Sequence, residues 1–240
     1  PDPKKALLAA SLRVDCYLLA LLAKADVLGR SCEDKPALLD KIALFTLYCE
    51  ELNCWRTPAR FISDGARFHY FHSENSVDPH YEPYPEQGSE VIVLCGLPGM
   101  GKDSYIRQYC ADMPVVSLDV LRQQHNIKPD DRDANGWIAQ LAKEQARIYL
   151  REHKSFVWNA TNITKQMRNQ LIALFYRYQA KVTLVYIEVP YLQWKKQNSA
   201  RKEAVPDKVM ERMLSKLEVP TPEEALNVIY WVDGEAQNLI

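Results

Sequence analysis

The hydrophobic residues repeat with a helical period near the N-terminus and form short strand-like runs after residue 90. Apolar positions at helical spacing run through 4–24 and again through 36–52, which predicts two helices packed as an antiparallel pair. After residue 90, strand-like and helix-like segments alternate. The predicted strands are 91–95, 114–118, 155–158, 182–188 and 227–232; the predicted helices are 104–110, 120–124, 137–153, 166–180, 192–198 and one after 206.

This alternation predicts an α/β domain, in which helices cover both faces of a parallel sheet. The segment 72–90 contains three prolines and many polar residues, so it is expected to be a linker without regular structure. A stiffened spacer is favoured over a binding segment there. The predicted organisation is therefore a small all-α segment over 1–71, a linker over 72–90 and an α/β domain over 91–240.

Composition and charge narrow the possible functions. The chain has 240 residues, 47% of them hydrophobic, and its 30 basic and 31 acidic side chains leave a net charge of −1. Such a balance argues against coating of long nucleic acids, although it permits binding of one strand end. The sequence has neither an apolar run of about 20 residues nor a signal-peptide pattern, so we expect a soluble cytoplasmic protein without a membrane partner.

The cysteines are scattered along the chain and form no CxxC pairs. This pattern favours reduced, mostly buried thiols over zinc ligands or a disulfide framework. The six positions are Cys16, Cys32, Cys49, Cys54, Cys95 and Cys110.

The strongest functional motif follows the first predicted strand and precedes a predicted helix. It fits GxxxxGK, a loop whose glycines turn backbone N–H groups onto phosphate oxygens while the helix N-terminus faces the same anion. The hydroxyl that usually follows the lysine arrives one position late, after an aspartate, so either of these two side chains is a candidate Mg²⁺ ligand. The candidate ATP-binding residues are Gly96, Pro98, Gly99, Met100, Gly101, Lys102, Asp103 and Ser104.

Further polar residues follow the later strands, and ligands in α/β folds gather at these carboxyl ends. Asp119 follows the second strand and suits a general base, and Arg122, one turn on, suits an anionic acceptor. The alternative is a helix cap with its turn partner. Asn159 and Asn162 follow the third strand, where a turn with a cap is equally compatible, and Arg168 lies in the next helix.

The segment 195–206 carries a basic helix end and a polar loop, which favours a lid over the transferring phosphoryl rather than solvated surface charge. The ordered motifs around Lys102, Asp119, Asn159 and Arg201 resemble those of the P-loop 5′-hydroxyl polynucleotide kinases. The resemblance implies a P-loop kinase-type three-layer αβα domain that uses ATP or another NTP with Mg²⁺. Its acceptor would be a nucleic-acid 5′-OH end, RNA favoured over DNA, during RNA repair.

The same resemblance assigns roles to individual residues. Lys102 would contact the β and γ phosphates, Asp119 would be the base, Arg122 would bind the acceptor phosphate, and Arg201 would be the lid arginine. Asn159, Asn162 and Arg168 would serve the acceptor or support the site. Three residues depart from the family pattern. Asp103 replaces the usual hydroxyl, Asn159 stands where related kinases often have an acidic residue, and Gln197 stands where related lids often have an arginine.

The sequence Ala-Asp-x-x-Gly-Arg around Asp26 resembles the last motif of HD-domain phosphohydrolases. The resemblance implies bacterial fusions of an HD domain with a polynucleotide kinase, in which residues 1–71 would be the incomplete C-terminal tail of the HD domain and its upstream part would be a partner. Asp26 would be a metal ligand only in a complete HD domain, because one carboxylate cannot hold a divalent ion alone. On residue chemistry alone, Asp26 is a structural polar group, and no phosphohydrolase activity is expected from these residues.

Two alternatives to a polynucleotide kinase remain open at this stage. One is a small-molecule or nucleoside kinase on the same fold, because a fold does not fix the acceptor. The other is a nucleotide-binding module without phosphotransfer. The sequence alone leaves the donor nucleotide, the RNA or DNA preference and the oligomeric state undetermined.

Overall fold

The structure is a computed structural model that describes residues 2–73, 77–84, 87–128, 131–201 and 204–237. It divides into two compact units, an N-terminal unit made mainly of Pro1–Pro83 and a C-terminal unit made of Tyr84–Pro220 and Glu224–Asn238. Thr221–Glu223 groups with the N-terminal unit. The division between the two units falls inside the segment in which the sequence places the linker.

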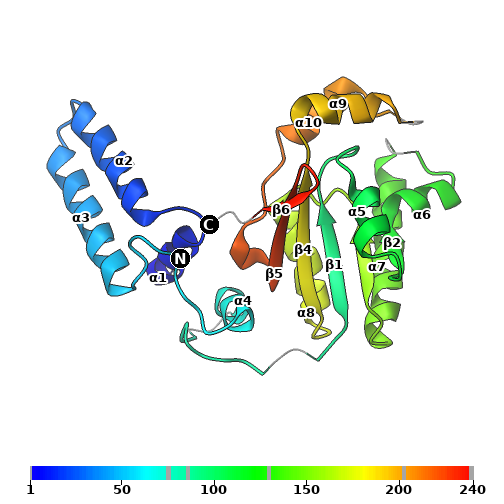
Figure 1. Cartoon of the computed structure of the whole chain (residues 1–240), viewed down its shortest axis with the longest axis horizontal. Coiled ribbons are helices and arrows are strands. Elements are labelled where there is room, and N and C mark those ends of the chain that lie inside the picture. Colours follow the sequence, from blue (N-terminus) through cyan, green and yellow to red (C-terminus); the bar gives the residue numbers. More distant parts are fainter. Residues whose placement is uncertain (1, 74–76, 85–86, 129–130, 202–203, 238–240) are drawn as a thin grey trace. The chain divides into compact units, whose positions relative to one another are not determined.

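The N-terminal unit is helical. Its helices are α1 (Pro3–Ser11), α2 (Cys16–Gly29), α3 (Lys35–Glu51) and α4 (Asp64–His72). Helices α2 and α3 lie side by side as an antiparallel pair (Figure 1), so the predicted pairing of two helices is confirmed. The single helix predicted over 4–24 is wrong, because the chain breaks between α1 and α2. Helix α4 was not predicted.

The break between the first two helices has a local cause. The Asp15 carboxylate accepts a hydrogen bond of 3.1 Å from the backbone N–H of Leu18, which caps a new helix at this point. The restart rotates the buried face away from the continuous stripe that the sequence suggests. The buried residues of α2 are Cys16, Ala20 and Val27, whereas Leu18, Leu21 and Leu22 are more than half exposed.

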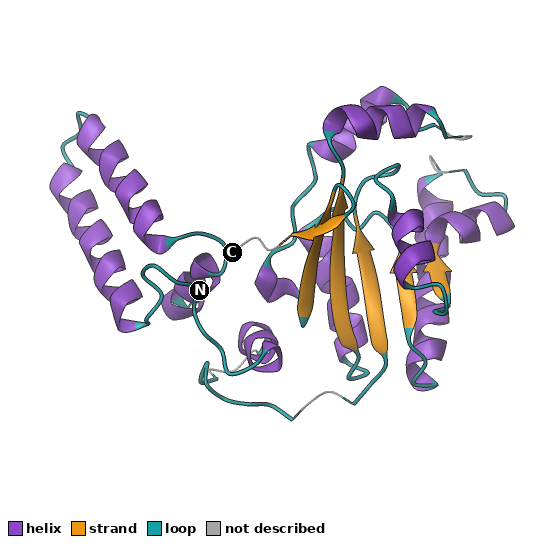
Figure 2. Ribbon diagram, viewed as in Figure 1, coloured by secondary structure: helices purple, strands orange, loops and turns teal. Residues whose placement is uncertain are grey.

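The C-terminal unit contains one sheet in the order β2-β3-β1-β4-β5-β6 (Figure 2). Its strands are β1 (Glu90–Cys95), β2 (Val115–Ser117), β3 (Phe156–Asn159), β4 (Lys181–Glu188), β5 (Asn227–Val232) and β6 (Glu235–Gln237). The first five strands run parallel, and each was predicted from its apolar run. Side chains of the central strands are buried on both faces, as a doubly covered parallel sheet requires.

Helices cover both faces of this sheet, so the predicted three-layer αβα architecture is confirmed. On one face, Leu94 of β1 and Val185 of β4 share a core with Trp194 and Met210 from the helices. On the other face, the ring of Phe156 lies 5.6 Å from that of Phe175. The helices are α5 (Lys102–Tyr109), α6 (Leu118–Gln124), α7 (Arg132–Arg151), α8 (Lys165–Tyr176), α9 (Tyr191–Ser199) and α10 (Asp207–Leu214), followed by the 3₁₀ helix η1 (Pro222–Glu224).

One strand departs from the parallel arrangement. Strand β6 pairs antiparallel with β5 through the turn Asp233-Gly234, whose φ angles are 51° and 88°. Positive φ at both central residues is the requirement of a tight hairpin turn, and Asp-Gly is a favoured pair for it. The Asp-Gly pair indicates such a hairpin, but this strand was not predicted.

No single helix among the described residues is both long and apolar enough to cross a bilayer. Taken together, α1 and α2 have the length and apolar composition of a membrane-spanning segment, but the two helices are bent by 105° relative to each other.

Candidate active site

A cavity of about 510 Å³ opens at the carboxyl ends of the parallel strands in the C-terminal unit. The loop after β1, the first turns of α5 and α6, one side of α7 and the segment after β3 all contribute to its walls. Most of the predicted site residues line this one cavity: Pro98, Gly99, Gly101, Lys102, Asp103, Ser104, Asp119, Arg122, Asn159, Asn162 and Arg201. Gly96, Met100 and Arg168 are not among its lining residues.

The loop between β1 and α5 has the backbone conformation that its glycines predict. Gly99 and Gly101 have φ angles of 84° and 98°, a region that side chains disfavour. A Cβ at Gly96 would lie 2.6 Å from the carbonyl oxygen of Ile187, so only glycine fits beside β4. The loop therefore brings the N-terminus of α5 to the cavity, where it favours an anion.

Lys102 begins helix α5 and turns its ammonium back toward the loop. Its Nζ donates hydrogen bonds to the carbonyl oxygens of Gly96 at 2.8 Å and Leu97 at 2.9 Å. Burial lowers the pKa of Lys102 to about 8, although the nearby carboxylates of Asp103 and Asp119 oppose this shift. Among the described residues, the hydrogen bonds of this ammonium go to two neutral carbonyl oxygens.

Asp103 occupies the helix position directly after the lysine. The amide Nδ2 of Asn159, at the end of β3, donates a hydrogen bond of 2.9 Å to Asp103 Oδ1. Ser104 Oγ instead accepts a hydrogen bond of 3.0 Å from Arg107. Two of the three residues that depart from the predicted family pattern, Asp103 and Asn159, therefore contact each other, while the Ser104 hydroxyl is hydrogen-bonded to Arg107.

Asp119 and Arg122 face each other at the start of α6. The helix cap is Ser117, whose Oγ accepts from Val120 N–H at 3.3 Å, so the alternative interpretation of Asp119 as the cap is wrong. The Asp119 side chain is 77% exposed and forms an ion pair with Arg122. Arg122 Nε also donates to Asn135 Oδ1 of α7 at 2.6 Å. The pair thus presents a carboxylate to the cavity and holds the arginine against α7.

Arg168 lies outside the cavity. Its side chain is fully buried, and its guanidinium donates to both carboxylate oxygens of Glu224, at 2.7 and 3.0 Å. It also donates to the carbonyl oxygens of Asn162 and Glu218. An acceptor-binding role for Arg168 is contradicted by this burial, because a ligand cannot reach a guanidinium enclosed by protein acceptors.

Asn162 holds the end of β1, directly before the phosphate loop, through hydrogen bonds. Its Nδ2 donates to the carbonyl oxygen of Leu94 at 2.6 Å, and its backbone has a positive φ of 45°. The thiol of Cys95 in turn donates to the carbonyl oxygen of Asn162 at 3.2 Å. Asn162 therefore ties the end of β1 to the segment after β3.

The predicted lid begins in helix α9 and continues toward α10. Gln197 and Arg201 line the cavity from this side, while Lys202 and Glu203 lie outside the described residues. The indole Nε1 of Trp194 donates to the carbonyl oxygen of Pro98 at 2.7 Å. Asn198 closes the following loop, since it both donates to and accepts from the backbone of Val205, at 2.8 and 3.0 Å. Sequence reasoning missed both anchors.

Two further cations line the cavity without having been predicted. Lys143 reaches it from α7 and Arg107 from α5. Arg107 lies one helical turn after Ser104 of the phosphate loop, whereas Lys143 lies near no motif, and only the amphipathic pattern of α7 indicates that one side of this helix faces a cavity. With Lys102, Arg122 and Arg201 they outnumber the two carboxylates that line the cavity, Asp103 and Asp119, and this excess of positive charge suits a polyanionic ligand.

A second cavity of about 210 Å³ adjoins the phosphate loop. Met100 and Ser104 line it from the loop and α5, Gln193 and Gln197 from α9, and Trp231 from the end of β5. An aromatic ring and two amides beside a phosphate loop provide both a stacking surface and hydrogen-bonding groups.

Asp26 does not form the metal site that the HD-domain motif suggests, as far as the described residues show. Its carboxylate forms an exposed ion pair of 2.5 Å with Arg30, the residue that directly follows α2. Among the described residues it belongs to no cluster of three metal-ligating side chains. The interpretation of Asp26 as a structural polar group fits this pairing, and an HD domain as its partner stays a prediction.

The fold and the loop define this protein as a P-loop kinase-like α/β protein. Residues 91–220 match the family described as "AAA domain", and the match covers more than half of the chain. The chain therefore belongs to this family.

Two curated relatives are also similar to this chain. Heterogeneous nuclear ribonucleoprotein U-like protein 2 from Mus musculus and the same protein from Homo sapiens are 26% identical over 212 residues. The match covers 78% of this chain and only 28% of each relative, so the chain spans less than a third of their length.

Among solved structures, a candidate kinase from Chloroflexus aurantiacus J-10-fl superposes with a TM-score of 0.51 and 13% identity, over 62% of this chain and 87% of that one. A chain of a Pnkp1/Rnl/Hen1 complex matches with a TM-score of 0.45 and 15% identity, over 53% of this chain and 44% of that one. At these identities the similarity concerns the fold alone.

Proposed function

We propose that this protein is an NTP-dependent kinase that transfers the γ-phosphoryl group of ATP to the 5′-OH end of a nucleic acid, RNA favoured over DNA. The observation that carries the proposal is that one cavity holds the phosphate loop with Lys102 and, on another wall, the exposed carboxylate of Asp119 beside Arg122. A phosphate-binding loop alone would serve any nucleotide-binding protein. The added carboxylate provides a base, and the added cations provide binding for an anionic acceptor.

In the proposed reaction, the Asp119 carboxylate takes the proton of the 5′-hydroxyl as its oxygen attacks the γ-phosphorus. The bond from the γ-phosphorus to the β–γ bridging oxygen breaks, and the nucleoside diphosphate leaves with that oxygen. Lys102 and Arg201 offset the charge on the transferred group. Arg122 and Lys143 hold a phosphate of the acceptor strand, and this contact places the terminal hydroxyl beside Asp119.

Oxygen donors suited to Mg²⁺ are present in the cavity wall. The Asp103 carboxylate lines the cavity and is oriented by Asn159, whereas Ser104 is bound to Arg107. Hard cations prefer such oxygen ligands, so Asp103 is the residue that would hold the ion. When bound with the nucleotide, Mg²⁺ supplies charge neutralisation for the β and γ phosphates.

The ring and amides around the smaller cavity are proposed to hold the base of the donor nucleotide. Trp231 offers a stacking surface, and Gln193 and Gln197 offer amide groups. The preference for RNA rests on the family resemblance, and the name of the curated relatives, which describes ribonucleoprotein-like proteins, supports it.

The test is a 5′-end-labelling assay with γ-labelled ATP, Mg²⁺ and matched RNA and DNA oligonucleotides that carry a 5′-OH. We expect label on the 5′-OH strands, more on RNA than on DNA, and none on strands that already carry a 5′-phosphate. Parallel reactions with the other NTPs define the donor. If a sugar or nucleoside receives the label while the oligonucleotides receive none, the proposed acceptor is wrong.

A small neutral acceptor is the second candidate, and one observation favours it. The Arg122 guanidinium already binds Asp119 and Asn135, so it would have to exchange partners to grip an acceptor phosphate. The substitution Arg122→Ala distinguishes the two candidate acceptors. If the acceptor is a nucleic-acid end, its KM should rise in the variant, whereas the KM of a neutral acceptor should stay unchanged.

A further inference from the structure

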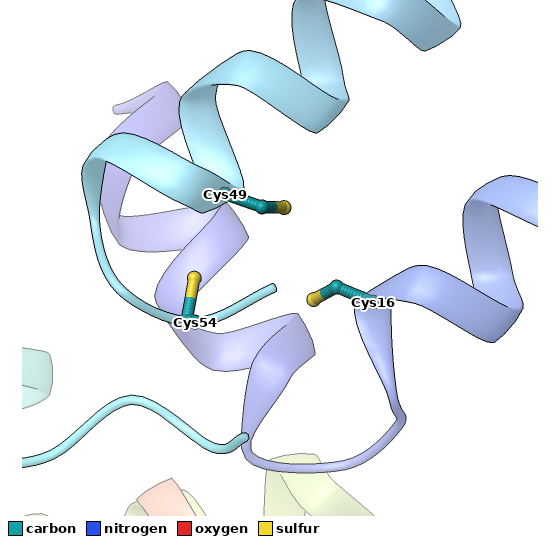
Figure 3. A group of neighbouring side chains, drawn as sticks. All are labelled: Cys16, Cys49 and Cys54. Atoms are coloured by element: carbon teal, nitrogen blue, oxygen red, sulfur yellow. The ribbon is translucent and has the colours of Figure 1, made fainter. Parts of the chain in front are cut away.

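Three cysteines of the N-terminal unit converge on one point (Figure 3). Cys16 opens α2, Cys49 lies in the last turn of α3, and Cys54 follows in the next loop. Their Sγ atoms all lie within 4.8 Å of one another, and each residue is at most 1% exposed. The chain thus brings together thiols from three separate segments, a grouping that their spacing in the sequence does not suggest.

The separation of the sulfur atoms suits one metal ion. A disulfide requires a separation of about 2.05 Å, and all six cysteines are free. A zinc ion at about 2.3 Å from each sulfur places tetrahedral ligands about 3.8 Å apart, which falls within the observed limit. A multi-iron cluster needs wider spacing, because irons and sulfides lie between the thiolates.

Backbone contacts hold the three segments in place. The N–H of Cys54 donates to the carbonyl oxygen of Cys49 at 2.9 Å, and the N–H of Tyr17 donates to that of Trp55 at the same distance. The rings of Tyr17 and Trp55 also meet edge to face at 5.7 Å. The residues beside each cysteine are therefore joined to one another, so the thiols are positioned by the fold before any ligand arrives.

Most side chains around the thiols are apolar, and the buried hydroxyl of Ser11 lies beside Cys54. Leu7, Leu8 and Ala59 belong to the same core as the three cysteines. Burial raises the pKa of each thiol, most strongly that of Cys49, so the thiols stay protonated without a cation beside them. Asp15 acts in the same direction on Cys16, whereas the N-terminus of α2 favours its thiolate. Three soft donors in a buried core select thiophilic ions over Mg²⁺ or Ca²⁺.

We propose that Cys16, Cys49 and Cys54 bind one thiophilic d¹⁰ metal ion, Zn²⁺ or Cu⁺, in the N-terminal unit. Each thiol releases its proton to solvent as its sulfur forms a bond to the ion, and the oxidation state of the ion does not change. Cu⁺ is satisfied by three thiolates, whereas Zn²⁺ keeps one water or another exogenous ligand. The ion ties α2, α3 and the following loop together, as metals commonly do in units with small cores.

The test uses the full chain, purified with a reductant and analysed for bound metal by elemental mass spectrometry. Metal-free protein is then titrated with Zn²⁺, with Cu⁺ and with Co²⁺, whose thiolate charge-transfer absorption reports sulfur ligation. We expect one ion per chain and a higher melting temperature of the N-terminal unit. Competition between Zn²⁺ and Cu⁺ identifies the preferred ion.

Matched variants locate the ion. Cys49→Ser and Cys16→Ala should each abolish the cobalt–thiolate band, while Cys32→Ser and Cys110→Ser should leave it unchanged. Far-UV circular dichroism identifies any variant that has lost its fold. The proposal is overturned if the folded, reduced wild type binds none of the three metals, or if a folded Cys49→Ser or Cys16→Ala variant keeps both the stoichiometry and the band.

Discussion

The amide of Asn159 donates a hydrogen bond of 2.9 Å to the carboxylate of Asp103. Asp103 stands where the P-loop motif usually has a hydroxyl. In the polynucleotide kinases that the sequence resembles, an acid is expected at the position of Asn159. Relative to that expected pattern, the carboxylate and the neutral polar group stand in each other's places. This exchange keeps one carboxylate at the place where the proposed Mg²⁺ would be held.

The first prediction concerns this pair. Asp103→Asn should lower kcat by roughly 10- to 10³-fold and raise the Mg²⁺ concentration needed for half-maximal rate, because the site loses its carboxylate. The double variant Asp103→Ser with Asn159→Asp should recover part of the rate. Titration of activity with Mg²⁺ measures both effects. Ser104→Ala is the control, and a larger effect there than at Asp103 would assign the ion to the hydroxyl.

The second prediction tests the base. Asp119→Asn should reduce phosphoryl transfer by roughly 10²- to 10⁴-fold, because the amide cannot accept the proton of the acceptor. Binding of ATP, measured by calorimetry, should stay nearly unchanged, since the phosphate loop is intact. The exposed Asp112 outside the cavity provides the matched control as Asp112→Asn. Full transfer activity in Asp119→Asn would remove this residue from the mechanism.

The sequence predicted those parts of the fold that depend on local patterns. Each parallel strand is a compact apolar run, and the phosphate loop is defined by glycines a few residues apart, so both could be located without long-range information. The partner of Asp103 lies 56 positions along the chain, and so does the partner of Arg168. No local pattern reveals such pairings, which is why the sequence left Arg168 between acceptor binding and support of the site, and did not identify Glu224 as its partner.

The helical segment shows the same limit in another form. An uninterrupted apolar stripe suggested one helix over 4–24, but a single side-chain cap at Asp15 was sufficient to restart the helix. The three converging cysteines also escaped prediction, since their spacing matches no metal motif. Their grouping depends on how α2, α3 and the following loop pack.

The third prediction follows from the lowered pKa of Lys102, about 8 instead of 10.5. Above pH 8 the free protein carries a neutral Lys102, so binding of a polyphosphate takes up a proton. The dissociation constant of ATP should therefore rise by up to about tenfold per pH unit above pH 8. Calorimetry in buffers of different ionisation enthalpy measures the proton uptake. Lys102→Arg stays charged and should show neither effect.

The lowered pKa of Lys102 also makes the free energy of unfolding depend on pH: ATP binding weakens as the pH rises, whereas the folded state becomes more stable. Between pH 8 and 10.5 the unfolded chain holds the Lys102 proton more strongly than the folded chain does. This group should therefore raise the free energy of unfolding as the pH increases through that range, and its unfavourable contribution is fully present below pH 8. A comparison of urea melts of wild type and Lys102→Met isolates it. A smaller wild-type advantage at high pH would contradict the assignment.

The fourth prediction concerns Trp194, which joins α9, at the start of the proposed lid, to the phosphate loop. Trp194→Phe keeps an aromatic ring in the core but removes the hydrogen bond to the carbonyl oxygen of Pro98. The unpaired carbonyl should cost about 1–3 kcal/mol and loosen α9 against the phosphate loop. Faster amide exchange in α9 and a higher KM for ATP are the expected results. Tyr191→Phe, at a partly exposed position on the same helix, should change neither measurement.

The fifth prediction separates support of the fold from catalysis at Arg168. The side chains of Arg168 and Glu224 are both at most 1% exposed, so removal of either breaks an ion pair that lies in the protein interior. Arg168→Ala and Glu224→Ala should each lower the free energy of unfolding by about 3–5 kcal/mol in urea melts. The more exposed pair of Arg147 and Glu144 is the control, where Arg147→Ala should cost about 1 kcal/mol or less. Unchanged stability in Arg168→Ala, with loss of acceptor binding, would instead return this arginine to the active site.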